Sequence, residues 1–245
     1  MYAIAQWYIH GEASQPYNMG VSFIPDYAQS LGVDPQETMD ALTGIGVKHF
    51  RLVSYWSDGE STKGQYDFSQ LDWQFKKAEA ANAKVTLSLG LRQPRWPECH
   101  MPTWAADETY NQWYPELKDY ITAVVNRYKS SQALESYQIE NEYFLKGFGM
   151  CETIPHAMDR ERLVDEYYLV KELDPQRILI VNRSNNALGW PVGAPTPDKF
   201  GISIYKRVWT PVLGRYIEYP FPAWFYGFVA GWQKMMTGQI GRAHV

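Results

Sequence analysis

The sequence predicts an α/β protein in which short apolar strands alternate with helices within one domain. Three observations carry this prediction: a strand signal followed by a helix signal recurs, the gaps are regular, and no linker or short repeat divides the 245 residues. This alternation is typical of a parallel sheet with helices packed on it. Several strands are short runs of β-branched or apolar residues, as expected for strands buried on both faces.

Six segments have the character of strands. They are Gly20–Ile24, His49–Val53, Lys84–Leu89, Ser136–Asn141, Arg177–Val181 and Phe200–Tyr205. The first clear helix begins with Asp34 as N-cap and Pro35 at the first helical position, and it ends near Gly44. The other expected helices are Ser69–Ala83, Tyr110–Tyr128, Asp159–Leu173 and Trp224–Met236.

Six β/α units fit either an open doubly wound sheet or a fragment of a (β/α)₈ TIM barrel. The segments that follow the strands are rich in polar and aromatic residues, which favours the barrel, where function concentrates at the C-terminal strand ends. We therefore expect an incomplete TIM barrel over residues 19–245, with residues 1–18 as an N-terminal extension. We expect no seventh or eighth strand between Trp209 and Val245.

The first residues, Met1–Ile9, are apolar but carry no basic residue and no clear cleavage site. They fit either the remnant of a membrane anchor located upstream or a first strand. No apolar run approaches the roughly 20 residues that span a bilayer. Localisation therefore stays open, with export or anchoring at the cell surface as one alternative.

Composition narrows the class of function. A formal charge of −4 and a pI of about 5.8 provide no basic surface for nucleic acid. The hydrophobic content of 45% with 20% charged residues is that of a globular domain. Aromatic residues make up 16% of the chain, including 10 Trp, and this abundance suits a cleft for flat, partly apolar ligands.

The sharpest chemical signal follows the expected fourth strand, in the run Gln138-Ile139-Glu140-Asn141-Glu142-Tyr143. Period-two alternation would place Gln138, Glu140 and Glu142 on one side, with Asn141 beside Glu142 at the rim. A partly desolvated carboxyl at the mouth of a barrel can donate a proton near neutrality. Cleavage of a glycosidic bond needs such a donor for the leaving oxygen.

This run resembles the fourth-strand motif of clan A retaining glycoside hydrolases, which include family 5 cellulases and family 35 and 42 β-galactosidases. The resemblance implies a barrel enzyme that hydrolyses a β-linked oligo- or polysaccharide without a cofactor. It assigns the acid/base role to Glu142 and the sugar 2-hydroxyl contact to Asn141. Arg51 and Tyr205 match polar or aromatic positions at the ends of strands 2 and 6, and the resemblance covers roughly residues 19–209.

The chain departs from this family at the nucleophile, which is a Glu at the end of strand 7, about 5–5.5 Å from the acid/base in retaining enzymes. The closing residues Gly238–Val245 contain no carboxylate side chain. We therefore expect a chain truncated before strand 7, inactive as given, whose last few residues are foreign to the natural protein. The alternative is a catalytically inactive carbohydrate-binding barrel.

Each candidate residue also has a structural interpretation. Glu142 could be a buried carboxylate that pairs with an arginine, although its position and its neighbour Asn141 favour catalysis. For Glu140 we favour an ion pair with Arg51 over a second inward carboxylate. Arg51 could hold the barrel mouth, contact the sugar, or do both.

Aromatic residues after strands 3, 5 and 6 are candidates for sugar platforms or for loop packing. They are Trp96, Trp104, Trp190 and Trp209, and we expect at least one of them, with Trp96 and Trp209 foremost, to bind substrate. His100 follows strand 3, where it either contacts the substrate or orders the loop.

Two cysteines, Cys99 and Cys151, follow neighbouring strands of the expected barrel, so a disulfide and two free thiols both remain open. No Cys-x₂-Cys pair or His-Glu-x-x-His run indicates a metal site. An aldolase-like or metal-dependent barrel would need a lysine on a strand or a cluster of metal ligands, and the sequence shows neither.

Overall fold

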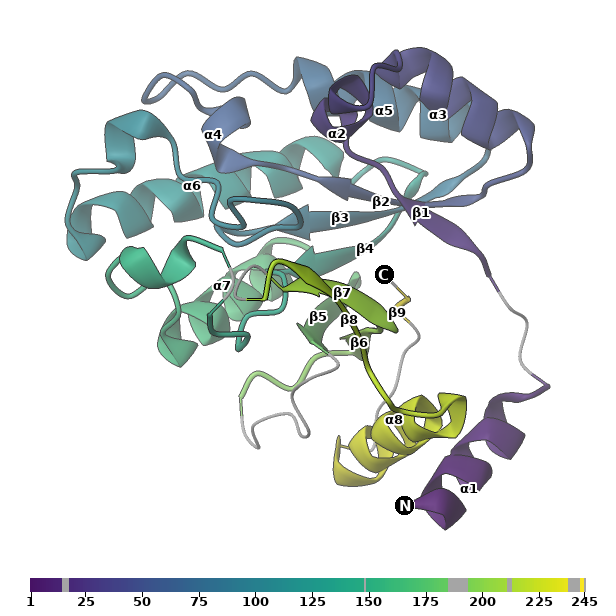
Figure 1. Ribbon diagram of the computed structural model, residues 1–245. Helices are drawn as coiled ribbons and strands as arrows, with labels where there is room; N and C mark the ends of the chain where they lie inside the picture. The colour runs from purple at the N-terminus through teal and green to yellow at the C-terminus, as the bar shows by residue number, and fades with distance from the viewer. Residues whose placement is uncertain (15–17, 148, 185–193, 211–212, 238–242, 245) are drawn as a thin grey trace.

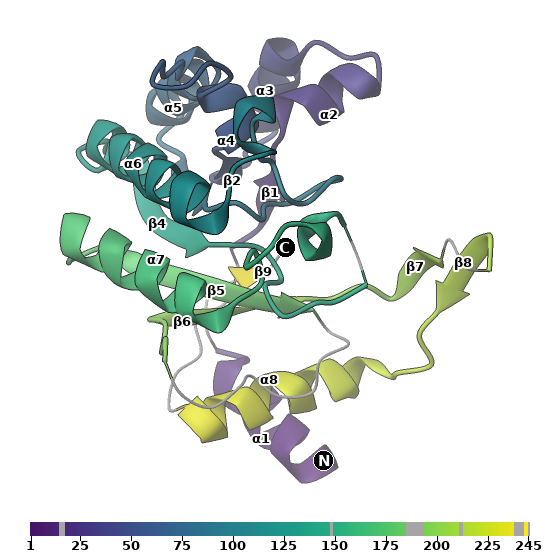
Figure 2. The same cartoon turned by 90° about the vertical axis from the view of Figure 1, so that its left-hand side faces the viewer.

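The computed structural model describes residues 1–14, 18–147, 149–184, 194–210, 213–237 and 243–244. Its main sheet is parallel, in the order β1-β2-β3-β4-β5-β6-β9, and it curls into part of a barrel (Figures 1 and 2). The strands are β1 (Gly20–Ser22), β2 (His49–Val53), β3 (Lys84–Leu89), β4 (Leu134–Ile139), β5 (Ile178–Ser184), β6 (Lys199–Ser203) and β9 (Ala243–His244). The predicted incomplete (β/α)₈ barrel is therefore confirmed.

Helices cover the outer face of this sheet (Figure 2). They are α2 (Pro25–Ser30), α3 (Pro35–Gly44), α5 (Ser69–Ala80), α6 (Tyr110–Tyr128) and α7 (Arg160–Leu173). The N-cap of α3 is the expected one, since the side chain of Asp34 accepts a hydrogen bond from the Glu37 backbone at 2.8 Å. Fully buried residues such as Leu87, Trp113 and Tyr137 fill the core between sheet and helices.

Three short helices lie in the segments that follow β2, β3 and β4. They are α4 (Trp56–Gly59), η1 (Thr103–Ala105) and η2 (Cys151–Thr153). In a parallel barrel these segments meet at the C-terminal edge of the sheet, where functional side chains gather. The fold therefore brings the segments that follow β2, β3 and β4, with their polar and aromatic residues, to one edge of the sheet.

Strand β4 ends two residues earlier than the sequence pattern predicts. The predicted alternation of Gln138, Glu140 and Glu142 on one side is wrong, because the strand stops at Ile139. Glu140 and Glu142 both adopt left-handed backbone, with φ of 58° and 44°. A residue in that conformation turns the chain out of the pleat, so the period of two no longer fixes the direction of the side chains.

The N-terminal segment is a helix, α1 (Tyr2–Glu12), so the alternative of a first strand is wrong. It packs against α8 (Ala223–Thr237), apart from the other helices (Figures 1 and 2). Gly227 and Gly231 permit this close approach, since a Cβ on Gly231 would stand 3.0 Å from the carbonyl oxygen of Ile4. None of the helices in the described residues is both long enough and apolar enough to cross a membrane.

The expectation of no further strand after Trp209 is also wrong. β7 (Arg207–Thr210) and β8 (Arg215–Glu218) form an antiparallel hairpin that projects beyond the end of β6 (Figure 2). The two-residue strand β9 pairs in parallel with β6, in the place where a seventh barrel strand lies. Neither residue of β9 is acidic, so β9 supplies no carboxylate.

Candidate active site

Glu142 lies three residues beyond the end of β4, at the C-terminal edge of the sheet. Its side chain is mostly buried, with 6% of the residue exposed, and its Oε1 atom accepts no hydrogen bond from the described residues. The charge of Glu142 acts on Arg51, Tyr205 and Glu98, and it raises the pKa of each. A buried carboxylate oxygen without a hydrogen bond is energetically costly, and Glu142 shares this feature with Glu108 and Glu166 among the described residues.

A chain of amide side chains holds the backbone of Glu142. Its N–H donates to Oδ1 of Asn182 at 2.9 Å. Nδ2 of Asn182 donates in turn to Oδ1 of Asn141 at 3.1 Å. Gln138 donates to the same Asn182 oxygen at 3.3 Å and accepts from Arg51 at 3.2 Å. The ends of β2, β4 and β5 are therefore joined by one polar network.

The favoured pairing of Glu140 with Arg51 is wrong. Glu140 is fully buried and pairs with Arg162 of α7, at 2.9 Å from Oε1 to Nη1. Its carboxylate also accepts the backbone N–H groups of Leu91 and Arg92 at 2.7 and 2.8 Å. Only glycine fits at position 90, because a Cβ there would stand 2.2 Å from Oε1 of Glu140. Glu140 therefore ties the loop after β3 to α7, on the other side of the strand from Gln138.

Arg51 lies on β2, where its Nε donates to Ser22 at 2.9 Å and its Nη1 to Gln138. Burial lowers its pKa to about 10, although the charge of Glu142 opposes this shift. Tyr205 follows β6 and is 45% exposed, and desolvation of its hydroxyl raises its pKa. The structure brings both predicted residues into the electrostatic environment of Glu142.

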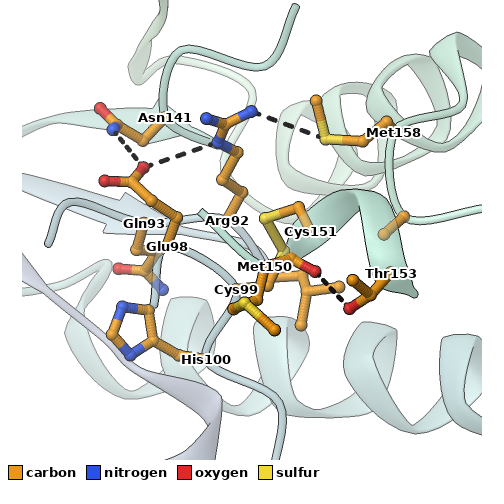
Figure 3. The surroundings of a disulfide bond; sticks show 12 residues. Arg92, Gln93, Glu98, Cys99, His100, Asn141, Met150, Cys151, Thr153 and Met158 are labelled. Atoms are coloured by element: carbon orange, nitrogen blue, oxygen red, sulfur yellow. Dashed lines mark hydrogen bonds and ion pairs between the residues drawn. A yellow bond between two sulfur atoms is a disulfide. The ribbon is translucent and has the colours of Figure 1, made fainter. Parts of the chain in front are cut away.

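Glu98, which no pattern in the sequence singles out, joins this polar network. Its Oε2 atom accepts from Nδ2 of Asn141 at 3.3 Å and lies 3.5 Å from Nε of Arg92 (Figure 3). Burial raises the pKa of Glu98 to about 7, Arg92 lowers it, and the charge of Glu142 raises it further. The network therefore contains a second buried carboxyl besides Glu142, and burial holds the pKa of this Glu98 carboxyl above its ordinary value.

A cleft of about 340 Å³ opens beside this network, between the segments that follow β1, β2 and β3. It is lined by Ile24, Asp26, Tyr27, Tyr55, Asp58, Arg95, Trp96, Pro97 and His100. Trp96 is 67% exposed, as a stacking platform requires, and the Arg95 guanidinium lies 4.0 Å from the ring centre of Tyr27. The cleft lies near the carboxyl network, because Tyr55, which lines the cleft, is within reach of the charge of Glu98.

The remaining predicted ligand contacts differ in their positions. His100 lines the cleft, and its ring stacks on that of Tyr55 with ring centres 3.5 Å apart. Burial lowers the pKa of His100 to about 4, which favours the uncharged imidazole near neutral pH. Trp104 is a packing residue, since its indole donates to the backbone of Glu60 at 2.7 Å. Trp209 lies 53% exposed on the projecting β7–β8 hairpin and does not line this cleft. Trp190 falls outside the described residues.

A disulfide joins Cys99 and Cys151, so the alternative of two free thiols does not hold. Figure 3 shows that this bond ties the segment carrying Glu98 to the segment that follows β4. Among the described residues, no group of three or more His, Cys, Asp or Glu side chains is arranged to hold a metal ion. The site is therefore built from carboxyl, amide, guanidinium and aromatic groups.

Comparison with solved structures finds the same fold in several glycoside hydrolases, and this confirms the barrel fold that the β4 motif predicts. An exo-β-1,4-mannosidase from Opitutaceae bacterium strain TAV5 superimposes with a TM-score of 0.56 at 17% identity, over 77% of this chain and 37% of the other. The GH5_18 protein of Streptomyces cattleya, solved with GlcNAc, gives 0.58 at 12% identity, over 77% and 51%.

Xylanase 10C from Cellvibrio japonicus, solved with xylopentaose, gives a TM-score of 0.54 at 16% identity, over 66% of this chain and 36% of the other. The chain therefore spans from about a third to about half of the length of these three proteins. No protein-family profile and no curated protein matches the sequence. These structural neighbours are glycosidases, in agreement with the type of enzyme that the sequence predicts.

Proposed function

We propose that the natural protein containing this chain is a retaining glycoside hydrolase that cleaves a β-linked saccharide by double displacement. Glu142 protonates the leaving oxygen while a second carboxylate attacks the anomeric carbon and forms a covalent glycosyl ester. Water then attacks the same carbon and displaces this carboxylate, and Glu142, now ionised, takes the proton of the water. The observation that carries the proposal is the buried Oε1 of Glu142, which accepts no hydrogen bond from the described residues while Arg51, Tyr205 and Glu98 surround its charge.

The saccharide binds at the C-terminal edge of the sheet. Asn141 contacts the sugar ring next to the cleaved bond, and Arg51 and Tyr205 border the same space. Trp96 provides an exposed ring on which a sugar can stack, within the 340 Å³ cleft that also contains His100. Trp209 contributes only if the substrate extends to the β7–β8 hairpin.

The second carboxylate of the pair is not among the side chains near β9, because residues 219–245 contain no Asp or Glu. A barrel that binds sugar without hydrolysing it is therefore the second candidate function. One assay distinguishes the two candidate functions. β-Linked oligosaccharides of mannose, xylose, glucose and galactose are incubated with the natural protein, and the products are followed by proton NMR.

A hydrolase of the proposed type releases a product whose first-formed anomer is β, because two inversions restore the configuration. A first-formed α anomer contradicts the double displacement. Perturbed sugar signals without any product support the binding barrel. A protein that neither binds nor cleaves any of these saccharides refutes both candidates.

A further inference from the structure

The backbone around Glu98 is shaped to hold this side chain in one place. Arg95 and Glu98 both adopt left-handed backbone, with φ of 84° and 72°, in a turn closed by a 2.7 Å hydrogen bond from Glu98 N to Arg95 O. Left-handed backbone is rare for residues with a side chain and persists where the surroundings enforce it. Gly149 lies so close that a Cβ on it would stand 2.7 Å from Cβ of Glu98.

The hydrogen bonds that reach Glu98 run in one direction. Asn182 accepts the N–H of Glu142 with its oxygen, so only its Nδ2 is left to donate to Asn141. Asn141 accepts this bond with its oxygen, so its Nδ2 must be the atom that donates to Glu98. Reversing either amide would set two donors or two acceptors against each other. This series of hydrogen bonds therefore requires an acceptor at its end, and Glu98 provides it.

We propose that Glu98 is a positioning residue whose ionised carboxylate fixes the amide of Asn141 and whose protonation releases it. This role rests on the proposed function in so far as Asn141 binds the sugar. With Glu98 ionised, one Nδ2 proton of Asn141 is held by Oε2, and the other is left in a defined direction for a sugar hydroxyl. An ionised carboxylate only accepts hydrogen bonds, whereas a protonated one also competes as a donor.

The charges around Glu98 come from several elements. Arg92, in the segment after β3, favours the ionised form, and Glu142, after β4, favours the protonated form. Tyr55, after β2, and Tyr205, after β6, also sense its charge. Burial is the largest influence and brings the pKa of Glu98 to about 7. The anchored state of Asn141 therefore predominates above about pH 7 and is lost as the pH falls below it.

The side-chain amide signals of Asn141 in ¹⁵N-labelled protein report this anchoring directly. They are assigned by their absence in Asn141→Asp and followed from pH 5.5 to pH 8.5. In the wild-type protein we expect them to shift with a midpoint near pH 7. Glu152→Gln is the matched control, because Glu152 lies on the neighbouring segment and is exposed, and it should leave the midpoint unchanged.

Glu98→Gln mimics the protonated carboxyl, because its amide has one acceptor oxygen and one donor group in place of two acceptor oxygens. Oε2 of Glu98 meets both Asn141 and Arg92, so a donor at this position would compete for the same space. We expect the Asn141 signals of this variant to stay near their wild-type position at low pH and to show no midpoint near pH 7. Signals that do not move in the wild-type protein, or that still titrate in Glu98→Gln, would overturn the proposal.

The backbone amide spectrum shows whether each variant is folded, and Glu98→Leu is a second test. Its Asn141 signals should match the wild-type low-pH position at every pH, and a match to the high-pH position contradicts the role. The readout needs no turnover. If the Asn141 signals titrate as expected but the protein has no hydrolytic activity, only the proposed function is refuted. If the protein is active but the Asn141 signals are constant, only the positioning role of Glu98 is refuted.

Discussion

Replacing Arg162 by Met tests whether the buried ion cluster behind β4 stabilises the fold. Arg162 has no exposed side-chain surface, and it meets Glu140 at 2.9 Å and also contacts Glu166. Its Nε and Nη2 donate to the carbonyl of Ala157 at 3.0 and 2.7 Å. Met fills a similar volume but leaves the buried carboxylates of Glu140 and Glu166 without their arginine. We expect the free energy of unfolding to fall by about 3–5 kcal/mol because of this uncompensated charge, and by about 1 kcal/mol because the carbonyl of Ala157 loses its hydrogen bonds.

Urea unfolding followed by tryptophan fluorescence measures this loss as a lower midpoint at unchanged slope. Arg127→Met is the matched control, because Arg127 forms a surface pair with Asp72 in which the two side chains are 46% and 40% exposed. Exposed pairs contribute less than about 1 kcal/mol, so the control should lose little. Equal losses in the two variants, or a loss below about 1 kcal/mol for Arg162→Met, would refute the reasoning.

Three further variants test other parts of the structure. Replacing Cys99 and Cys151 by Ser should lower the free energy of unfolding by about 4 kcal/mol, since the disulfide closes a loop over a separation of 52 residues. Urea unfolding that is the same as in the wild-type protein contradicts the disulfide. Trp96→Ala should weaken oligosaccharide binding about tenfold in calorimetry, whereas unchanged affinity excludes it as a platform. Gly231→Val should lower the free energy of unfolding by about 1–3 kcal/mol, because the added side chain crowds α1. Gly11→Ala is the control and should not destabilise the protein, because the space around Gly11 is open. Equal thermal unfolding of the two variants argues against the α1–α8 contact.

The sequence predicts the regular parts of the sheet well. The bounds of β2, β3 and α6 are as predicted, because short runs rich in β-branched or apolar residues and a clear helical pattern mark them in the sequence. The end of β4 differs for a physical reason. Left-handed backbone at Glu140 accompanies contacts with the loop after β3 and with α7, and at Glu142 it accompanies a contact with Asn182 of β5. No local pattern in the sequence encodes these contacts.

The candidate site was only partly predictable. Asn141 and Glu142 follow β4 and Arg51 lies on β2, so the topology alone brings them to the same part of the sheet. Glu98 lies in an irregular segment with no period, and its contact with Asn141 joins residues 43 positions apart. The two cysteines were the available signal, because a bond between Cys99 and Cys151 necessarily draws Glu98 towards the residues that follow β4.

The acid role of Glu142 is tested most directly by the dependence of Glu142→Gln on the leaving group. In the natural protein, kcat/KM of this variant is compared with wild type on an alkyl β-glycoside and on a 2,4-dinitrophenyl β-glycoside. A poor leaving group needs the proton, so we expect a loss of about 10²–10⁴-fold on the alkyl substrate and little loss of the first step on the dinitrophenyl one. An equal loss on both substrates, or no loss on either, would contradict the account.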